Sequence, residues 1–249
     1  MTTRYGRQFL QIPGPSNVPD RVLRAIDQPT IDHRGPDFKE FTWGLLERVK
    51  KVFKCEDHVI IYPSSGSGAW EAALVNTLSP GDTILMAETG GFAVLWRDIA
   101  IRFGLNVDFV PGDWRHGVDP QIIEEKLKTD ESQSIKAVAV VQNETSTGVT
   151  SDIFKVRQAI DAANHSALLL VDVISSLGSV DYRHSEWGVD VTIGGSQKGL
   201  MLPPGLGFNA INQKAIKASA DAKLPKSYWN WSPILESNSN GFFPYTPAT

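Results

Sequence analysis

The sequence predicts an α/β fold with a mostly parallel central sheet that is flanked by helices. Short apolar runs alternate with amphipathic stretches along much of the chain, which is the order of elements in βαβ units. Residues 137–141 are apolar without alternation, as expected of a strand that is covered on both faces in a parallel sheet. A chain of 249 residues, 41% of them hydrophobic, can bury a large core.

Six segments have the composition of strands, namely residues 58–62, 83–87, 106–110, 136–142, 167–172 and 189–193. Five segments are predicted as helices, namely residues 36–53, 68–78, 91–103, 120–128 and 152–164. The first helix begins at a proline, which the first helical turn tolerates, and its apolar residues recur at helical spacing. From about Lys223 onward the sequence is rich in proline, serine, asparagine and aromatic residues, and its apolar residues show no helical or strand periodicity. This tail is therefore predicted as irregular and not as a domain.

Charge and composition narrow the classes of function. The net charge is -4, with 24 Lys and Arg against 28 Asp and Glu, and no basic run carries interleaved aromatic residues, so nucleic acid is not an expected partner. The single cysteine, Cys55, excludes an internal disulfide and a multi-cysteine metal site, and no metal is predicted. No apolar stretch has the length of a signal peptide or a membrane span, so the simplest inference is a soluble cytoplasmic protein.

Five polar loops follow predicted strands, where a parallel sheet would place them at one edge. These loops cover residues 64–71, 88–92, 142–148, 172–178 and 196–198. Ligands of open α/β sheets bind at that edge, outside the carboxyl ends of the strands. The loops are therefore the candidates for a functional site.

Each loop taken alone also has an ordinary structural explanation. The Ser-Gly turn at residues 64–68 could hold a phosphate at a helix N-terminus, although simple capping is the commoner use of such a turn. Phe92 could cover a flat ring or belong to the core. Asp172 could cap the next turn or pair with a lysine as readily as bind a cofactor. Lys198 would be solvated unless burial among glycines lowers its pKa and leaves a nucleophilic amine.

In combination the loops resemble the class V, fold type I pyridoxal phosphate aminotransferases, most closely the serine-glyoxylate and alanine-glyoxylate aminotransferases. Seven segments carry the resemblance in order along nearly the whole chain, namely residues 13–19, 32–36, 65–68, 143–148, 171–172, 195–199 and 203–205. The resemblance implies the large domain of that fold type, pyridoxal 5′-phosphate as cofactor, and transfer of an amino group to glyoxylate to give glycine. Serine is the expected amino donor, with alanine or aspartate as alternatives.

The resemblance also implies a role for each loop. Lys198 would form a Schiff base with the cofactor and then move a proton at the substrate Cα, and Asp172 would pair with the pyridine nitrogen. Phe92 and Ile174 would cover the two faces of the ring. The remaining cofactor contacts would come from Thr145 at the phenolic oxygen and, at the phosphate, from Ser65, Gly66, Ser67, Gln197 and the Thr246 of the other subunit of a homodimer.

Two parts are expected in this chain, an N-terminal arm over residues 1–20 and a cofactor-binding large domain over residues 21–249. The resemblance implies a further small C-terminal domain, expected to be absent here, whose arginine clamps the substrate carboxylate. No arginine follows Arg183 in the sequence. We therefore expect this chain to bind cofactor and to turn over poorly, and robust transaminase activity would contradict that expectation. A cofactor-binding remnant without turnover stays open as an alternative.

Overall fold

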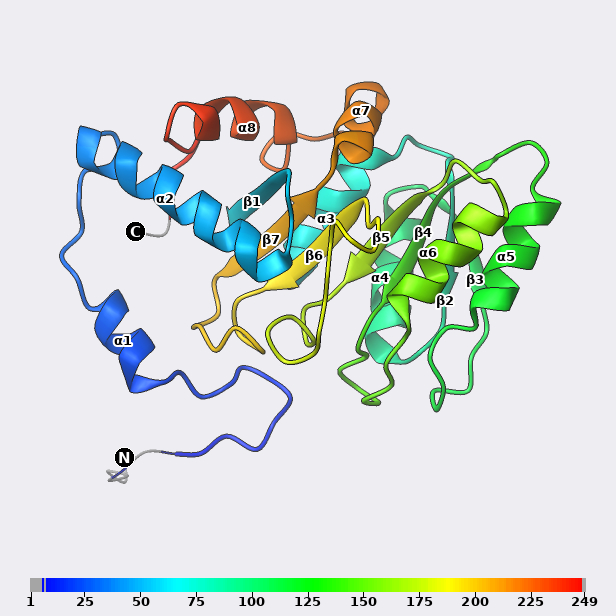
Figure 1. The fold of residues 1–249 in the computed structure, drawn as a ribbon, viewed down its shortest axis with the longest axis horizontal. Helices are drawn as coiled ribbons and strands as arrows, with labels where there is room; N and C mark the ends of the chain where they lie inside the picture. The colour runs from blue at the N-terminus through cyan, green and yellow to red at the C-terminus, as the bar shows by residue number, and fades with distance from the viewer. Residues whose placement is uncertain (1–5, 7, 248–249) are drawn as a thin grey trace.

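One seven-stranded sheet forms the centre of the computed structural model, which describes residue 6 and residues 8–247 (Figure 1). The strands are β1 (His58–Pro63), β2 (Thr83–Ala87), β3 (Asn106–Val110), β4 (Ile135–Val141), β5 (Leu168–Asp172), β6 (Val191–Gly195) and β7 (Leu206–Ile211). Their spatial order is β1-β7-β6-β5-β4-β2-β3, and β7 runs antiparallel to both of its neighbours, β1 and β6, whereas the other pairs are parallel. The predicted mostly parallel α/β fold is confirmed.

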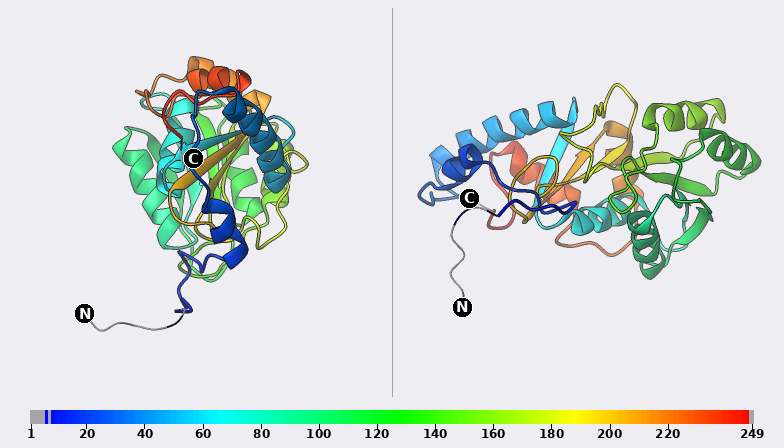
Figure 2. Two further views of the ribbon diagram at one scale, coloured as in Figure 1. Left: turned by 90° about the vertical axis from the view of Figure 1, so that its left-hand side faces the viewer. Right: turned by 90° about the horizontal axis from the view of Figure 1, so that it is seen from below.

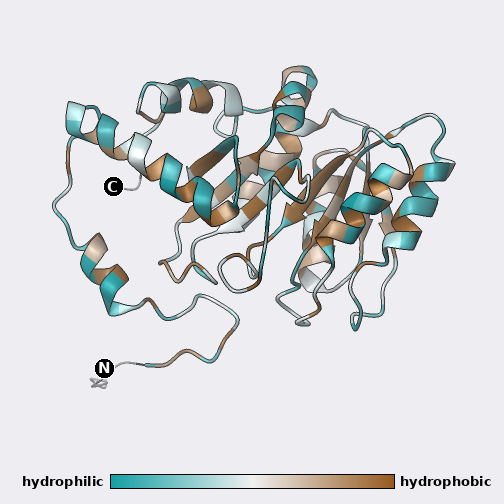
Figure 3. Cartoon of the chain, viewed as in Figure 1, coloured by the Kyte–Doolittle hydropathy of each residue, from teal (hydrophilic) through white to brown (hydrophobic). Residues whose placement is uncertain are grey.

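Helices cover both faces of this sheet, as the two turned views show (Figure 2). The covering helices are α2 (Pro36–Phe53), α3 (Gly66–Thr77), α4 (Gly91–Arg102), α5 (Pro120–Thr129), α6 (Ile153–Ala162), α7 (Gln213–Asp221) and α8 (Trp231–Ser239), whereas α1 (Asp20–Ile26) has no buried residue and lies apart from the sheet. One apolar core joins the sheet to α2, α5 and α6, and a second joins it to α3, α4, α7 and α8. The hydropathy colouring shows brown along the strands and teal on the outer sides of α5 and α6 (Figure 3), as expected for amphipathic helices on a buried sheet.

The prediction of an irregular tail after Lys223 was wrong, because α8 lies within it. Asn230 caps this helix by accepting a hydrogen bond from the backbone N–H of Ser232 at 3.2 Å. Trp231 is fully buried, and its indole N–H donates to the hydroxyl of Tyr62 at 2.8 Å. A single cap and one deeply buried tryptophan thus stabilise a helix whose sequence shows little periodic pattern.

The apolar face predicted for α2 is only partly covered in the structure. Phe38 and Phe53 are buried, whereas Phe41 is 49% exposed and Val52 is 45% exposed. An apolar groove runs between α2, the β1–β7 edge of the sheet and the C-terminal segment. None of the helices in the described part of the chain has the length and hydropathy needed to cross a bilayer.

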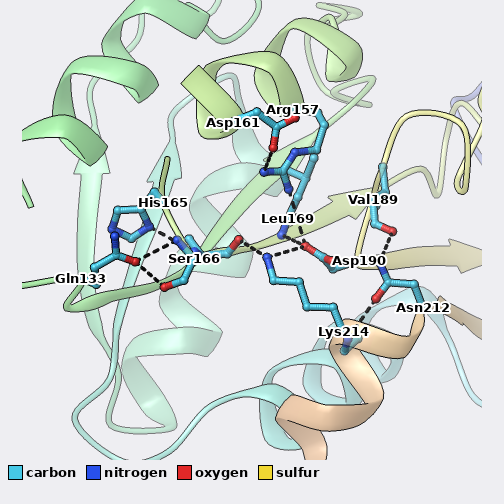
Figure 4. Close-up of polar contacts among 12 residues, drawn as sticks. Gln133, Arg157, Asp161, His165, Ser166, Leu169, Val189, Asp190, Asn212 and Lys214 are labelled. Carbon is cyan, nitrogen blue, oxygen red and sulfur yellow. Dashed lines mark hydrogen bonds and ion pairs between the residues drawn. The ribbon is translucent and has the colours of Figure 1, made fainter. Parts of the chain in front are cut away.

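A buried carboxylate, Asp190, joins several elements at the amino ends of β5 and β6 (Figure 4). Its oxygens accept hydrogen bonds from the backbone N–H of Leu169 at 2.7 Å and from the amide of Asn212 at 2.8 Å. Arg157 of α6 and Lys214 of α7 place charged nitrogens 3.8 Å and 3.6 Å away. This cluster lies at the opposite ends of the strands from residues 172 and 198, so its role is to hold the scaffold.

Replacing Asp190 with alanine is expected to lower the free energy of unfolding by about 3 kcal/mol. The change leaves Arg157, which is only 13% exposed, without its buried counter-charge. It also leaves the buried Leu169 N–H without an acceptor and removes one acceptor of the half-buried Asn212 amide. Urea denaturation measures the loss. The control is Asp161→Ala, which removes the exposed ion-pair partner of the same arginine and should cost less than about 1 kcal/mol. Equal losses in the two variants would contradict the prediction.

Candidate functional site

Lys198 and Asp172 lie at the carboxyl ends of two adjacent parallel strands. Asp172 is the last residue of β5, and its register partner is Ile193 on β6. Lys198 follows the end of β6 by three residues, in a turn that begins at Ser196. The sheet therefore brings the two residues predicted to be catalytic to the same edge.

The amine of Lys198 is held between Thr145 and Phe92. Its Nζ donates a hydrogen bond to the Thr145 hydroxyl at 2.7 Å and lies 4.9 Å from the centre of the Phe92 ring. Burial lowers the pKa of Lys198, although the negative charges of Asp172 and Glu144 act in the opposite direction. More of the amine is therefore uncharged and nucleophilic than in a solvated lysine.

Asp172 is 3% exposed, and two donors orient its carboxylate. Its Oδ2 accepts from the Trp70 indole N–H at 2.8 Å, and its Oδ1 accepts from the Ile174 backbone N–H at 2.7 Å. Burial raises the pKa of Asp172 to about 7, while the two hydrogen bonds and the charge of Lys198 act to lower it. A carboxylate has about four lone-pair positions, so two remain for a further donor.

An unbroken series of contacts connects these groups. The Trp70 ring, which binds Asp172, lies 6.4 Å from the Phe92 ring, and Phe92 lies under the Lys198 amine. Sequence reasoning selected Phe92 and Lys198 but missed Trp70. The only available signal was its place in the first turns of the helix that follows the Ser-Gly loop.

The N-terminus of α3 is open to an anion. Its cap residue, Ser65, makes no side-chain capping bond, and Ser65 and Ser67 are exposed. The unpaired N–H groups of a first helical turn and nearby hydroxyls are suited to a phosphate. A Cβ added to Gly66 would lie 2.3 Å from Cδ1 of Ile174, so a side chain there would displace Ile174.

Three more of the predicted residues converge over Gly195. A Cβ built on Gly195 would lie 3.1 Å from Oε1 of Gln197, 3.3 Å from Cγ2 of Ile174 and 3.8 Å from Cα of Gly66. The amide of Gln197, the side chain of Ile174 and the first turn of α3 therefore surround one small space. The structure therefore brings these three residues together, and their roles toward a phosphate and a ring stay predictions.

Thr246 is the predicted residue that the structure does not bring to this site. It is exposed near the end of the described residues, and its neighbour Tyr245 donates a hydrogen bond to the carbonyl of Ile61 at 3.2 Å. Within the described part of the chain, no hydrogen bond joins Thr246 to the other predicted residues. Its role toward another subunit stays a prediction.

The N-terminal arm contacts the main chain of the Lys198 loop. The Ser16 N–H donates to the carbonyl of Gln197 at 2.8 Å, and the Ser16 hydroxyl donates to the carbonyl of Lys198 at 3.0 Å. A Cβ added to Gly14 would lie 2.9 Å from Cγ of Lys198. Residues 14–16 thus pack directly against the lysine, a contact that the sequence analysis did not assign to them.

Glu144 is fully buried and holds the helix that carries Phe92. Its carboxylate accepts from the backbone N–H groups of Phe92 at 3.2 Å and Ala93 at 3.1 Å, and from the N–H and hydroxyl of Ser146. A carboxylate at a helix N-terminus satisfies otherwise unpaired donors and complements the helix dipole. Glu144 therefore determines where the Phe92 ring lies.

Replacing Glu144 with glutamine is expected to lower the free energy of unfolding by about 2 kcal/mol. The amide NH2 cannot accept the hydrogen bonds that one carboxylate oxygen now accepts, so a buried donor loses its partner. Chemical denaturation followed by circular dichroism measures the change. Glu125→Gln, at an exposed position on α5, serves as the control, and a loss no larger than that of the control would contradict this account.

Comparison with known proteins assigns the chain to a family. The fold and the site define a protein with a lysine and an aspartate at adjacent strand ends of an open α/β sheet, above a helix N-terminus that is open to an anion. A family model described as aminotransferase class-V matches residues 8–225. The chain belongs to the class-V aminotransferase family.

Particular relatives are similar over nearly the whole chain. The serine–glyoxylate aminotransferase of Methylorubrum extorquens is 50% identical over 99% of this chain and 63% of its own length. The L-aspartate–glyoxylate aminotransferase of Paracoccus denitrificans is 47% identical over 95% of this chain and 60% of its own length. A solved alanine–glyoxylate aminotransferase from Nostoc sp. superposes with a TM-score of 0.89 at 27% identity, over 99% of this chain and 65% of that one. This chain thus spans about three fifths of the length of the curated relatives it matches.

Proposed function

We propose that this chain binds pyridoxal 5′-phosphate and is part of an aminotransferase that moves an amino group from serine to glyoxylate, giving hydroxypyruvate and glycine. The observation that carries the proposal is the Lys198 amine, partly desolvated and 2.7 Å from Thr145, at the same sheet edge as the buried Asp172. Family membership and the 50% identity to a serine–glyoxylate aminotransferase support it.

The residues present fit this cofactor. The open N-terminus of α3 and the hydroxyls of Ser65 and Ser67 suit its phosphate, because backbone N–H groups at a helix start favour anions. The absence of a side chain at Gly195 lets Gln197, Ile174 and Gly66 lie close together, so the residues proposed for the phosphate and the ring face are adjacent. The unused lone pairs of Asp172 suit a ring N–H.

Bound at this site, pyridoxal phosphate supplies an aldehyde that receives the amino group and a ring that stabilises negative charge at the substrate Cα. Lys198 would hold the cofactor through its amine, and the same amine would serve as the base that moves the proton at that Cα. Phe92 and Ile174 would cover the faces of the ring, and Thr145 would bind its phenolic oxygen. Ser65, Gly66, Ser67 and Gln197 hold the phosphate.

A homodimer belongs to the same proposal, with Thr246 reaching the phosphate of the other subunit. Exposed apolar side chains on the arm and on α2, among them Phe9, Ile12 and Phe41, support an interface that involves these segments, because exposed apolar surface is characteristic of interaction sites. The division into an arm over residues 1–20 and a cofactor-binding domain over residues 21–249 and the cytoplasmic location stay predictions from the sequence.

Aspartate is the second candidate donor, because the aspartate–glyoxylate enzyme is nearly as similar to this chain as the serine–glyoxylate enzyme. Alanine is a third. The sequence of this chain has no arginine after Arg183, and arginine is the residue type expected to bind the carboxylate of the donor. The sequence identity of residues 1–249 to these relatives therefore does not distinguish serine, aspartate and alanine as amino donors.

Adding pyridoxal phosphate to the purified chain tests the proposal. We expect the visible absorbance of a lysine-linked cofactor, followed by release of hydroxypyruvate in a single turnover with serine. Cofactor attachment without release of any keto acid would indicate a binding remnant. A failure to bind the cofactor would overturn the proposal, and a screen of serine, alanine and aspartate against glyoxylate identifies the donor.

A further inference from the structure

Two buried tryptophans stack beside the candidate site, and only one of them binds a partner. Trp70 and Trp96 are both fully buried, with ring centres 5.8 Å apart and planes 11° apart. The Trp70 indole N–H donates to Oδ2 of Asp172 at 2.8 Å. The Trp96 indole N–H is also buried and has no hydrogen-bond partner among the described residues.

The bond from Trp70 has an electrostatic consequence for Asp172. A carboxylate that is removed from water is costly to ionise, and a donor fixed on one oxygen offsets part of that cost. The second donor, the Ile174 N–H, belongs to the chain turn after β5. Trp70 is therefore the only side chain in the described structure that donates a hydrogen bond to Asp172.

The same bond also fixes the direction of the carboxylate. One oxygen is held by the turn and the other by an indole that itself packs against Phe92 and Trp96 of α4. Rotation of the carboxylate would break at least one of the two bonds. The remaining lone pairs of Asp172 consequently have a defined orientation.

We propose that Trp70 is a positioning residue that keeps Asp172 ionised and aimed at the ring nitrogen of bound pyridoxal phosphate. This inference rests on the proposed function. Trp70 would not touch the cofactor itself. It would instead determine how strongly Asp172 binds the ring nitrogen. A tryptophan that only filled the core would instead support all cofactor contacts equally.

The test compares two ligands in three proteins. The ligands are pyridoxal 5′-phosphate and its 1-deaza analogue, in which a carbon replaces the ring nitrogen. The proteins are the unaltered chain, Trp70→Phe and Trp96→Phe, and absorbance titration gives the dissociation constants. The Trp96→Phe variant is the matched control, because it removes a stacked, buried indole that makes no hydrogen bond.

We expect the unaltered chain to prefer pyridoxal phosphate over the deaza analogue. Trp70→Phe should reduce this preference about tenfold, the order that a hydrogen bond to a charged group is worth, while Trp96→Phe should leave it within about twofold. Should Trp70→Phe fail to fold, β-(3-benzothienyl)alanine at position 70 keeps the ring shape and removes the N–H. The same reduction is expected for that variant.

Equal weakening of both ligands in the position-70 variants would overturn the inference, since it would show a packing role alone. An equal fall of the preference in Trp96→Phe would overturn it as well. If the unaltered chain binds neither ligand, the proposed function itself fails. If the unaltered chain binds both ligands but the position-70 variants keep its full preference for pyridoxal phosphate, the proposed function stands and the inference about Trp70 does not.

Discussion

Lys198→Ala is expected to abolish covalent attachment of pyridoxal phosphate and to slow any amino transfer by at least about a thousandfold. The variant loses the amine that lies 2.7 Å from Thr145 and 4.9 Å from the Phe92 ring centre. It thereby loses both the nucleophile and the base, and a positioned base alone is worth on the order of 10²- to 10⁴-fold. Borohydride reduction followed by mass spectrometry of the peptides measures attachment directly.

A second lysine provides the control for Lys198→Ala. Burial also lowers the pKa of Lys226, but its amine binds the carbonyls of Ser219 and Ala222 and takes no part in the site. Lys226→Ala should keep the adduct at residue 198. An adduct that persists in Lys198→Ala and disappears in Lys226→Ala would mean that the wrong lysine has been assigned.

The cofactor-free protein is expected to lose stability between about pH 4 and pH 7 because of Asp172. Burial raises its pKa from 3.8 in the unfolded chain to about 7 in the folded one, so the folded state binds a proton that the unfolded state has released. The stability contributed by the protonated form is complete below about pH 4 and is lost as the pH rises through 7. The slope is up to about 1.4 kcal/mol per pH unit.

Urea denaturation of the cofactor-free chain from pH 5 to pH 7.5 measures this effect against Asp172→Asn. The asparagine carries no titratable proton. The unfolding free energy of that variant should therefore fall less steeply with pH than that of the unaltered chain, with a slope smaller by up to about 1.4 kcal/mol per pH unit. Asp37→Asn, at an exposed position in the first turn of α2, should follow the unaltered chain. Parallel pH profiles for Asp172→Asn and the unaltered chain would rule out the raised pKa.

The elements predicted from the sequence are those with a strong local signal. The strands at residues 83–87 and 106–110 and the helix at residues 36–53 have the predicted bounds, because apolar runs, amphipathic spacing and a proline at the helix start define them locally. The missed strand, β7, contains Gly207 and the fully buried Asn209. Asn209 binds the Tyr62 hydroxyl at 3.0 Å and the Ala69 carbonyl at 3.1 Å. These contacts cross about 140 residues of chain, so no local pattern could reveal them.

The residues of the site also divide into those that the sequence predicts and those that it does not. The positions of Lys198 and Asp172 could be predicted because a parallel sheet gathers the loops after its strands at one edge. Trp70, Glu144 and Ser16 could not, because each acts through a hydrogen bond to an element distant in sequence. A buried tryptophan and a buried glutamate have many uses in a core, and only the partner atom distinguishes among them.

The docking of Ser16 on the backbone of residues 197 and 198 sets an order of events during synthesis. The two sides of that contact are separated by 181 and 182 positions along the chain. Residues 197 and 198 must therefore be synthesised before Ser16 has a backbone to dock on, and closing so large a loop is slow. The turn that carries Lys198 is thus completed late in folding, by a segment that precedes it by more than 180 positions along the chain.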